Sequence, residues 1–176
     1  MDVTVLVVPG MGNSGPNHWQ TLWEQENPAF RRVNQHDWDH PVLFEWVMTL
    51  EKALASVTGP KVLVGHSLGS IIIVEAAMQS PEEIAGALLV APPDVEQMEG
   101  GGQVPRGTLP FPSLVVTSEN DPWVSLDRSE EFARTWGSRF VNIGPAGHIN
   151  ADSGLGDWPE GKRLFRELLD EVNEGA

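Results

Sequence analysis

Apolar and polar positions along the chain follow two alternating patterns. Short runs of β-branched and apolar residues, typical of strands, predict strands over residues 3–8, 31–35, 61–65, 86–91, 113–118 and 139–143. Longer segments between them predict helices over residues 17–26, 42–56, 68–79, 125–135 and 159–174. This alternation predicts βαβ units, and therefore a parallel sheet with right-handed crossovers. The near-continuous apolar strands favour a sheet that is covered by helices on both faces.

One predicted helix conflicts with local propensity. Residues 71–74 are Ile-Ile-Ile-Val, and four β-branched residues cost about 2 kcal/mol together in a helix. We still predict a helix here, because burial of these side chains gains more free energy than the propensity loses.

Residues 92–112 are the one long irregular segment, with three glycines at positions 100–102. They predict either a surface loop or, since they follow a strand next to the motif described below, a lid or rim over a pocket. The chain shows no internal repeat and no long linker, and 176 residues suit one domain over residues 1–176.

Composition narrows the classes of function. The 25 acidic and 11 basic residues give a formal net charge of −14, which argues against nucleic-acid partners and against anionic membrane surfaces. The absence of cysteine excludes disulfides, thiolate metal sites and a catalytic thiol. The apolar stretch at the N-terminus is short and has no basic residues before it, so we expect neither a signal peptide nor a membrane span, and a cytoplasmic location.

The most informative motif is Gly65-His66-Ser67-Leu68-Gly69, a G-x-S-x-G pattern between a predicted strand and a predicted helix. In this setting the pattern is typical of a nucleophile elbow, which exposes a serine on a strained strand-to-helix turn. Glycines two residues before and after the serine let strand and helix approach closely. The motif predicts that Ser67 is a nucleophile.

A serine nucleophile needs an acid and a base later in the chain, at the carboxyl ends of strands. Asp121 follows the fifth predicted strand and is our candidate acid, with Glu119 and Asp127 as weaker alternatives. His148 follows the sixth and is our candidate base. The order Ser67, Asp121, His148 is the one that hydrolases with a nucleophile elbow use, in which imidazole takes the serine proton and the carboxylate orients the imidazole.

The remaining site predictions concern the transition state and the pocket. An oxyanion hole is expected from the backbone N–H groups of Leu68 and of the loop after the first strand, where Met11 is favoured over Gly12. His66, Trp123 and Asn13 are candidate pocket residues. No phosphate-binding glycine motif is present, and no cofactor is expected.

His36 and His40 have the i, i+4 spacing of a helical metal site. Pro41 disfavours a helix through His40, so we predict a loop here, with Asp39 capping the following helix, and no metal.

Several motifs together resemble a known family. Residues 7–10 and 13–16, Gly65-His66-Ser67, Ser118 with Asn120-Asp121-Pro122, and Gly147-His148 with Asn150 are similar to the short α/β-hydrolases of the retinoblastoma-binding protein 9 type, over essentially the whole chain. The resemblance implies an α/β-hydrolase fold: a three-layer sandwich around a six-stranded parallel sheet in the order 2-1-3-4-5-6, without a cap domain. It also implies the triad Ser67, Asp121 and His148. The retinoblastoma-binding motif requires a cysteine, so that partner is not expected here.

We therefore expect a serine hydrolase that cleaves small esters through an acyl-enzyme, with amides of amino acids as an alternative substrate class. Its partner would be a small-molecule substrate. Two other readings stay open: a non-enzymatic protein-interaction module on an inherited fold, and an enzyme that uses the same elbow for lyase or acyl-transfer chemistry.

Overall fold

The computed structural model describes residues 3–175 and contains one six-stranded sheet. All neighbouring strands are parallel, and their order is β2-β1-β3-β4-β5-β6. The strands are β1 (Thr4–Val8), β2 (Arg31–Arg32), β3 (Lys61–His66), β4 (Gly86–Val90), β5 (Ser113–Thr117) and β6 (Arg139–Asn142). The predicted strand order is confirmed, as is the α/β-hydrolase fold that it characterises.

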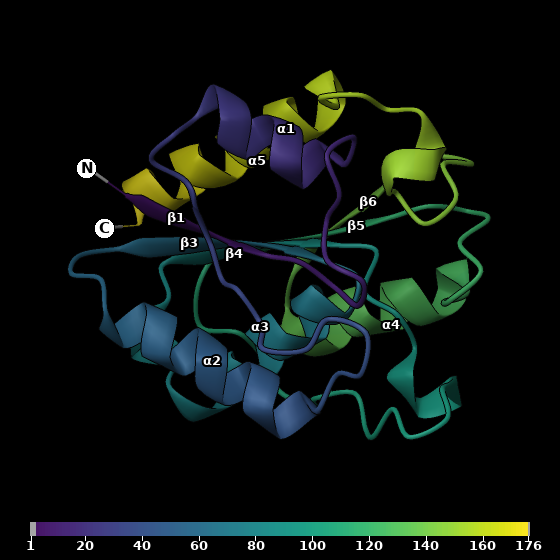
Figure 1. Ribbon diagram of the computed structural model, residues 1–176, viewed down its shortest axis with the longest axis horizontal. Coiled ribbons are helices and arrows are strands. Elements are labelled where there is room, and N and C mark those ends of the chain that lie inside the picture. Colours follow the sequence, from purple (N-terminus) through teal and green to yellow (C-terminus); the bar gives the residue numbers. More distant parts are fainter. Residues whose placement is uncertain (1–2, 176) are drawn as a thin grey trace.

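Five α-helices cover the sheet on both faces. They are α1 (Trp19–Glu26), α2 (Leu43–Ala55), α3 (Leu68–Gln79), α4 (Leu126–Trp136) and α5 (Pro159–Glu174). Helices α1 and α5 lie on one face and α2, α3 and α4 on the other, which makes a three-layer sandwich (Figure 1). No inserted cap domain interrupts this arrangement between residues 3 and 175.

Each face of the sheet has its own apolar core. On one side, α2, α3 and α4 contribute Leu50, Ile72 and Trp136, among others. On the other, the tryptophans Trp19, Trp23 and Trp158 pack edge-to-face or stacked with ring centroids 4.8–6.2 Å apart. Both faces of the central strands are thus buried, which explains why their sequences are apolar without alternation.

Residues 71–74 form part of helix α3 and are fully buried, as expected. Packing against the sheet outweighs their preference for strand. The prediction for residues 31–35 was too long, since β2 contains only Arg31 and Arg32. This edge strand pairs with β1 through two residues and then leaves the sheet.

The predicted cap of α2 was wrong. Val42 occupies the N-cap position of α2 without a side-chain hydrogen bond, while Asp37 Oδ1 accepts the N–H groups of Asp39 and His40 within the preceding loop. Among residues 3–175, no helix combines the length and apolar composition required to cross a bilayer.

Candidate active site

Ser67 lies on a sharp turn between β3 and α3. Its backbone has φ 54° and ψ −128°, a strained conformation for a residue with a side chain. The flanking glycines are needed for close approach: a Cβ on Gly69 would lie 2.0 Å from the Val8 carbonyl oxygen, and one on Gly65 would lie 2.7 Å from Ile73 Cδ1. The turn therefore has the geometry that the sequence motif predicts.

The structure brings the three predicted chemical groups together. Ser67 Oγ lies 2.7 Å from His148 Nε2, and His148 Nδ1 lies 2.8 Å from Asp121 Oδ2. The Asp121 side chain is fully buried and that of His148 is 12% exposed. Consecutive hydrogen bonds thus connect the buried carboxylate to the imidazole and the imidazole to the serine hydroxyl.

The alternative acids do not reach His148 in this structure. Glu119 is exposed and accepts a hydrogen bond from Asn142 Nδ2 at 3.0 Å, on the β6 side. Asp127 lies in the first turn of α4. Asp121 is also fixed from a second direction, because its Oδ1 accepts the backbone N–H of Trp123 at 2.9 Å.

The loop that carries His148 is held by side chains from other segments. His66 Nε2 lies 2.9 Å from the His148 carbonyl oxygen, and Trp19 Nε1 donates to the carbonyl oxygen of Ile149 at 2.8 Å. Ile149 is fully buried with φ 48°, an unusual conformation for a β-branched residue. These contacts stabilise a strained backbone next to the imidazole.

Two further side chains from the loop after β5 bind the same segment. Ser118 Oγ accepts the N–H of Ala146 at 2.8 Å, and Asn120 Oδ1 accepts the N–H of Gly147 at 2.7 Å. The loops that bear Asp121 and His148 are therefore joined directly. Trp19 is predicted only as a core or packing residue, because a contact with Ile149, 130 residues away, gives no signal in a single sequence.

His66 and His18 lie beneath this loop rather than in a pocket. Burial, together with the nearby His18 and His148, holds the pKa of His66 well below its usual value. Burial, followed by the charge of Arg32 and the proximity of His148, lowers the pKa of His18 to about 4. Both imidazoles are thus neutral at pH 7.

Two backbone N–H groups beside Ser67 are available to a ligand. Leu68 is the first residue of α3, so its N–H has no acceptor within the helix. Met11 N–H has no hydrogen-bond acceptor among residues 3–175, whereas Gly12 N–H donates to the Trp38 carbonyl at 2.8 Å. The loop after β1 packs on the elbow, since a Cβ on Gly10 would lie 2.9 Å from Ser67 Cβ.

A hollow of about 400 Å³ opens over Ser67. Its walls are mainly apolar and include Met11, Leu43, Val95, Met98 and Trp123, and Glu99 is the only carboxylate among the described residues that line it. Of the three predicted pocket residues, Trp123 lines it and is 47% exposed.

The other two predicted pocket residues have different surroundings. His66 is buried against the His148 loop. Asn13 Oδ1 accepts hydrogen bonds from Arg32 Nη1 and from the N–H of Ser14, so its side chain stabilises its own loop.

Part of the irregular segment forms the rim of this hollow, through Pro93, Val95 and residues 98–101. Arg128 on α4 holds the rim: its guanidinium bonds Asp94 at 3.2 Å and Glu96 at 2.6 Å. The segment thus lies where the alternative prediction, a rim over a pocket, places it. The ion pairs with Arg128 fix it to α4.

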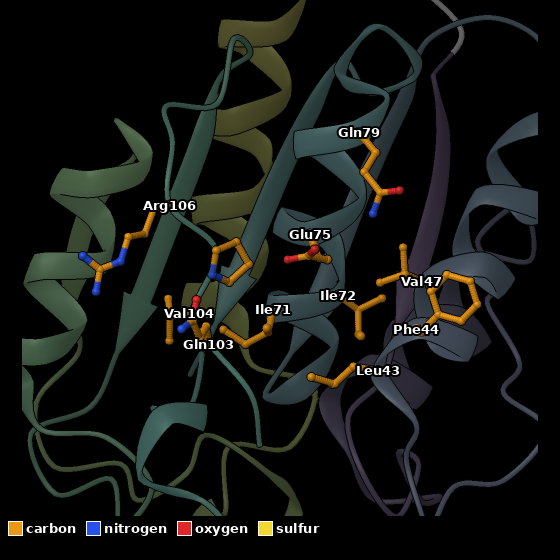
Figure 2. A pocket seen from close by; sticks show the side chains of 11 residues that line it. Leu43, Phe44, Val47, Ile71, Ile72, Glu75, Gln79, Gln103, Val104 and Arg106 are labelled. Carbon is orange, nitrogen blue, oxygen red and sulfur yellow. The ribbon is translucent and has the colours of Figure 1, made fainter. Parts of the chain in front are cut away.

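A second hollow, of about 440 Å³, lies farther along α3 (Figure 2). It is bounded by α2, α3 and residues 103–106, and contains neither Ser67 nor His148. Leu43 lines both hollows.

Residues 36–40 form a loop, as expected, in which His40 Nδ1 lies 3.2 Å from Asp37 Oδ2. The described part of the chain holds no cluster of three or more side chains suited to bind a metal ion.

Comparisons with known proteins show the family and the fold of this chain. Residues 5–167 match the model of a family described as serine hydrolase. A YdeN-like hydrolase from Pectobacterium atrosepticum is 35% identical, with a TM-score of 0.92 over 97% of this chain and 92% of the other. No curated protein sequence matches the chain significantly.

Two solved structures of lower identity share the fold. The ydeN gene product of B. subtilis has 20% identity and a TM-score of 0.78, covering 97% of this chain and all of the other. A thermophilic esterase from Thermogutta terrifontis has 20% identity and a TM-score of 0.69, covering 98% and 91%.

Proposed function

The chain belongs to the serine hydrolase family, and from this premise we propose that Ser67, His148 and Asp121 form a catalytic triad that cleaves small esters through an acyl-enzyme. The observation that carries the proposal is the 2.7 Å contact between Ser67 Oγ and His148 Nε2, made by a serine on a strained turn. A hydroxyl and an imidazole at this distance can exchange a proton directly.

The triad contacts define a proton path. The Asp121 carboxylate accepts the Nδ1–H of His148, which leaves the Nε2 lone pair facing the serine hydroxyl. As Oγ bonds to the ester carbonyl carbon, Nε2 takes the hydroxyl proton, and it gives that proton to the leaving alkoxide when the C–O bond breaks. A water molecule then repeats the sequence on the acyl-enzyme and releases the acid.

The negative charge that develops on the carbonyl oxygen requires donors. The N–H groups of Leu68 and Met11 are the proposed oxyanion hole, and Gly12 is disfavoured because the Trp38 carbonyl already accepts its N–H. Such fixed donors stabilise the tetrahedral intermediate more than the substrate.

The walls of the hollow suggest the substrate class. A largely apolar pocket of about 400 Å³ with one carboxylate, Glu99, favours small uncharged or cationic groups over anionic ones. Small esters are the proposed substrates. Amides of amino acids are the alternative, since the same acyl-enzyme chemistry cleaves both. Hydrolysis of matched ester and amide substrates would separate the two.

Labelling with a fluorophosphonate tests the nucleophile, because this reagent phosphonylates an activated serine. We expect stoichiometric labelling of Ser67 in the native chain and none in Ser67→Ala. Ser70→Ala is the matched control: Ser70 is a fully buried serine one helical turn away, bonded to the Val90 carbonyl, and its loss should leave labelling intact. An unlabelled native chain would support a non-enzymatic interaction module instead.

A further inference from the structure

We propose that Leu43 sets the acyl-chain length that the enzyme accepts, by separating the hollow at Ser67 from the second hollow along α3. This inference rests on the proposed esterase function and concerns the specificity of the same site. Among residues 3–175, Leu43 alone lines both hollows.

Helix α3 provides a continuous floor that leads away from the nucleophile. Leu68 lines the hollow at Ser67, whereas Ile71, Ile72, Glu75 and Gln79 line the second hollow. These positions recur at three- and four-residue spacing and therefore share one helix face. With a rise of 1.5 Å per residue, Gln79 lies about 16 Å beyond Leu68 along the axis. An extended acyl chain that starts at Ser67 would thus follow α3 into the second hollow.

Leu43 blocks that path from the opposite side. It is the first residue of α2 and is half-buried. Its side chain lies next to the irregular segment 92–112, since a Cβ on Gly102 would lie 3.3 Å from Leu43 Cδ1. The leucine side chain thus closes the space between α2 and the rim segment, and a short acyl group ends against it.

The part of the second hollow next to Leu43 is suited to bind methylene groups. Ile71, Ile72 and Val47 form its apolar walls near Leu43, and Figure 2 shows Glu75 and then Gln79 farther along. The carboxylate of Glu75 is costly to bury without a partner, so a chain that passes Leu43 should gain affinity only as far as Glu75.

The test is the chain-length profile of Leu43→Ala. For p-nitrophenyl acetate, butyrate and octanoate, we expect the native chain to prefer the two short esters. Octanoate has four more methylenes than butyrate, and each methylene removed from water favours binding about four-fold. We therefore expect Leu43→Ala to raise the octanoate-to-butyrate ratio of kcat/KM by at least about ten-fold. Leu43→Val should give an intermediate ratio. Because it removes fewer atoms than Leu43→Ala, it provides the measurement if the alanine variant does not fold.

Phe44→Ala is the matched control. Phe44 is the neighbouring residue on α2, lines only the second hollow and is 71% exposed. Alone it should leave the ratio unchanged, because native acyl groups do not reach it. In combination with Leu43→Ala it should reduce the gain on octanoate.

A parallel series of fluorophosphonates with ethyl and octyl chains measures the same selectivity without turnover. A native preference for octanoate, or an unchanged ratio in both Leu43 variants while Ser67 is still labelled, would overturn the role of Leu43 and leave the proposed function intact. Absence of Ser67 labelling with every reagent would overturn the proposed function, and this inference with it.

Discussion

Asp121 hydrogen-bonds two neighbours, Trp123 and His148. Oδ1 accepts the backbone N–H of Trp123, and His148 Nδ1 lies 2.8 Å from Oδ2 and 3.0 Å from Oδ1. The turn that fixes the aspartate and the contact that orients the imidazole are therefore made by one fully buried side chain. An amide in place of this carboxylate would present an N–H where His148 needs an acceptor.

Asp121→Asn is expected to lower kcat about 10⁴-fold, by analogy with the triad in which the same change stabilises the wrong imidazole tautomer. The control is Glu119→Gln, whose side chain bonds Asn142 rather than His148 and which should retain nearly full activity. Steady-state ester hydrolysis measures both. The opposite ranking of the two variants would make Glu119 the acid.

Ser67→Ala and His148→Ala should each reduce ester hydrolysis by at least about 10³-fold, and the double variant should be hardly slower than either one. The two residues share one proton transfer, so losing one removes the benefit of the other. Multiplicative losses in the double variant would show that they act in separate steps.

The residues that sequence analysis could place are those named by a local rule. Ser67 has its glycines, and Asp121 and His148 follow strands whose carboxyl ends meet at one edge of the sheet. Pocket residues were harder to predict, because the position of a residue near a strand end does not determine where its side chain points. His66 extends under the His148 loop and Asn13 bonds Arg32, and both contacts join residues distant in sequence.

At the scale of elements, the loop between β6 and α5 depends on donors from elsewhere. Trp19 on α1 and His66 at the end of β3 bind two successive carbonyl groups, those of Ile149 and His148. The strained φ of Ile149 persists because this bonding and full burial stabilise it.

Trp19→Phe keeps an aromatic ring but removes the N–H that binds Ile149. We expect kcat to fall about ten-fold or more with little change in KM, since small displacements of a catalytic group are costly. Trp23→Phe is the matched control: it removes an indole N–H bonded to the Asp157 carbonyl, away from His148. Equal losses of kcat in the two variants would indicate general destabilisation rather than positioning.

The contact between α3 and β1 depends on Gly69. Gly69→Ala should destabilise the fold by about 3 kcal/mol, because its Cβ would lie 2.0 Å from the Val8 carbonyl oxygen and the backbone would have to move. Gly15→Ala has open space around the added methyl group and should leave the free energy of unfolding almost unchanged. Urea unfolding of both variants provides the measurement.

The element boundaries show what local patterns can and cannot predict. Helix α5 was predicted to the residue, because a proline starts it and apolar residues recur at helical spacing. Strand β2 was overestimated, because its length depends on where it leaves β1, a tertiary property. Helix α3 goes against the β propensity of residues 71–74, and the burial of these side chains accounts for the helix.

For the whole molecule, the comparisons confirm that the chain is a short serine hydrolase, as the resemblance of its motifs indicates, and the α/β-hydrolase fold is confirmed with it. That outcome could be reached from sequence because strand and helix patterns, motif order and chain length all agree. A single domain over residues 1–176 stays a prediction.

The buried imidazoles should make stability depend on pH. His18 has a folded pKa of about 4 against an unfolded value of 6.5, so the unfolded chain binds more protons between these values. Its stabilising contribution is present above pH 6.5 and is lost as the pH falls toward 4, a loss of about 3 kcal/mol. His66, whose pKa is also lowered, acts in the same direction.

Unfolding free energies measured from pH 7.5 to 4 test this expectation. His18→Asn keeps a side-chain acceptor at the N-cap of α1 but does not titrate, so its stability should decline less steeply with acid. Ser125→Asn is the control, since it keeps a side-chain acceptor at the N-cap of α4 and replaces no titratable group, so it should leave the slope unchanged. Equal slopes in the native chain and His18→Asn would contradict the assignment.

The separation of the triad residues along the chain has a consequence for refolding. Ser67 and His148 are 81 residues apart, and the loop that holds His148 follows β6, an edge strand paired with β5 alone. Contacts between such distant residues form more slowly than local ones, because they cost more loop-closure entropy. In refolding from urea, secondary structure measured by circular dichroism should therefore recover before serine reactivity, so that the proposed active site reports when the last strand has docked.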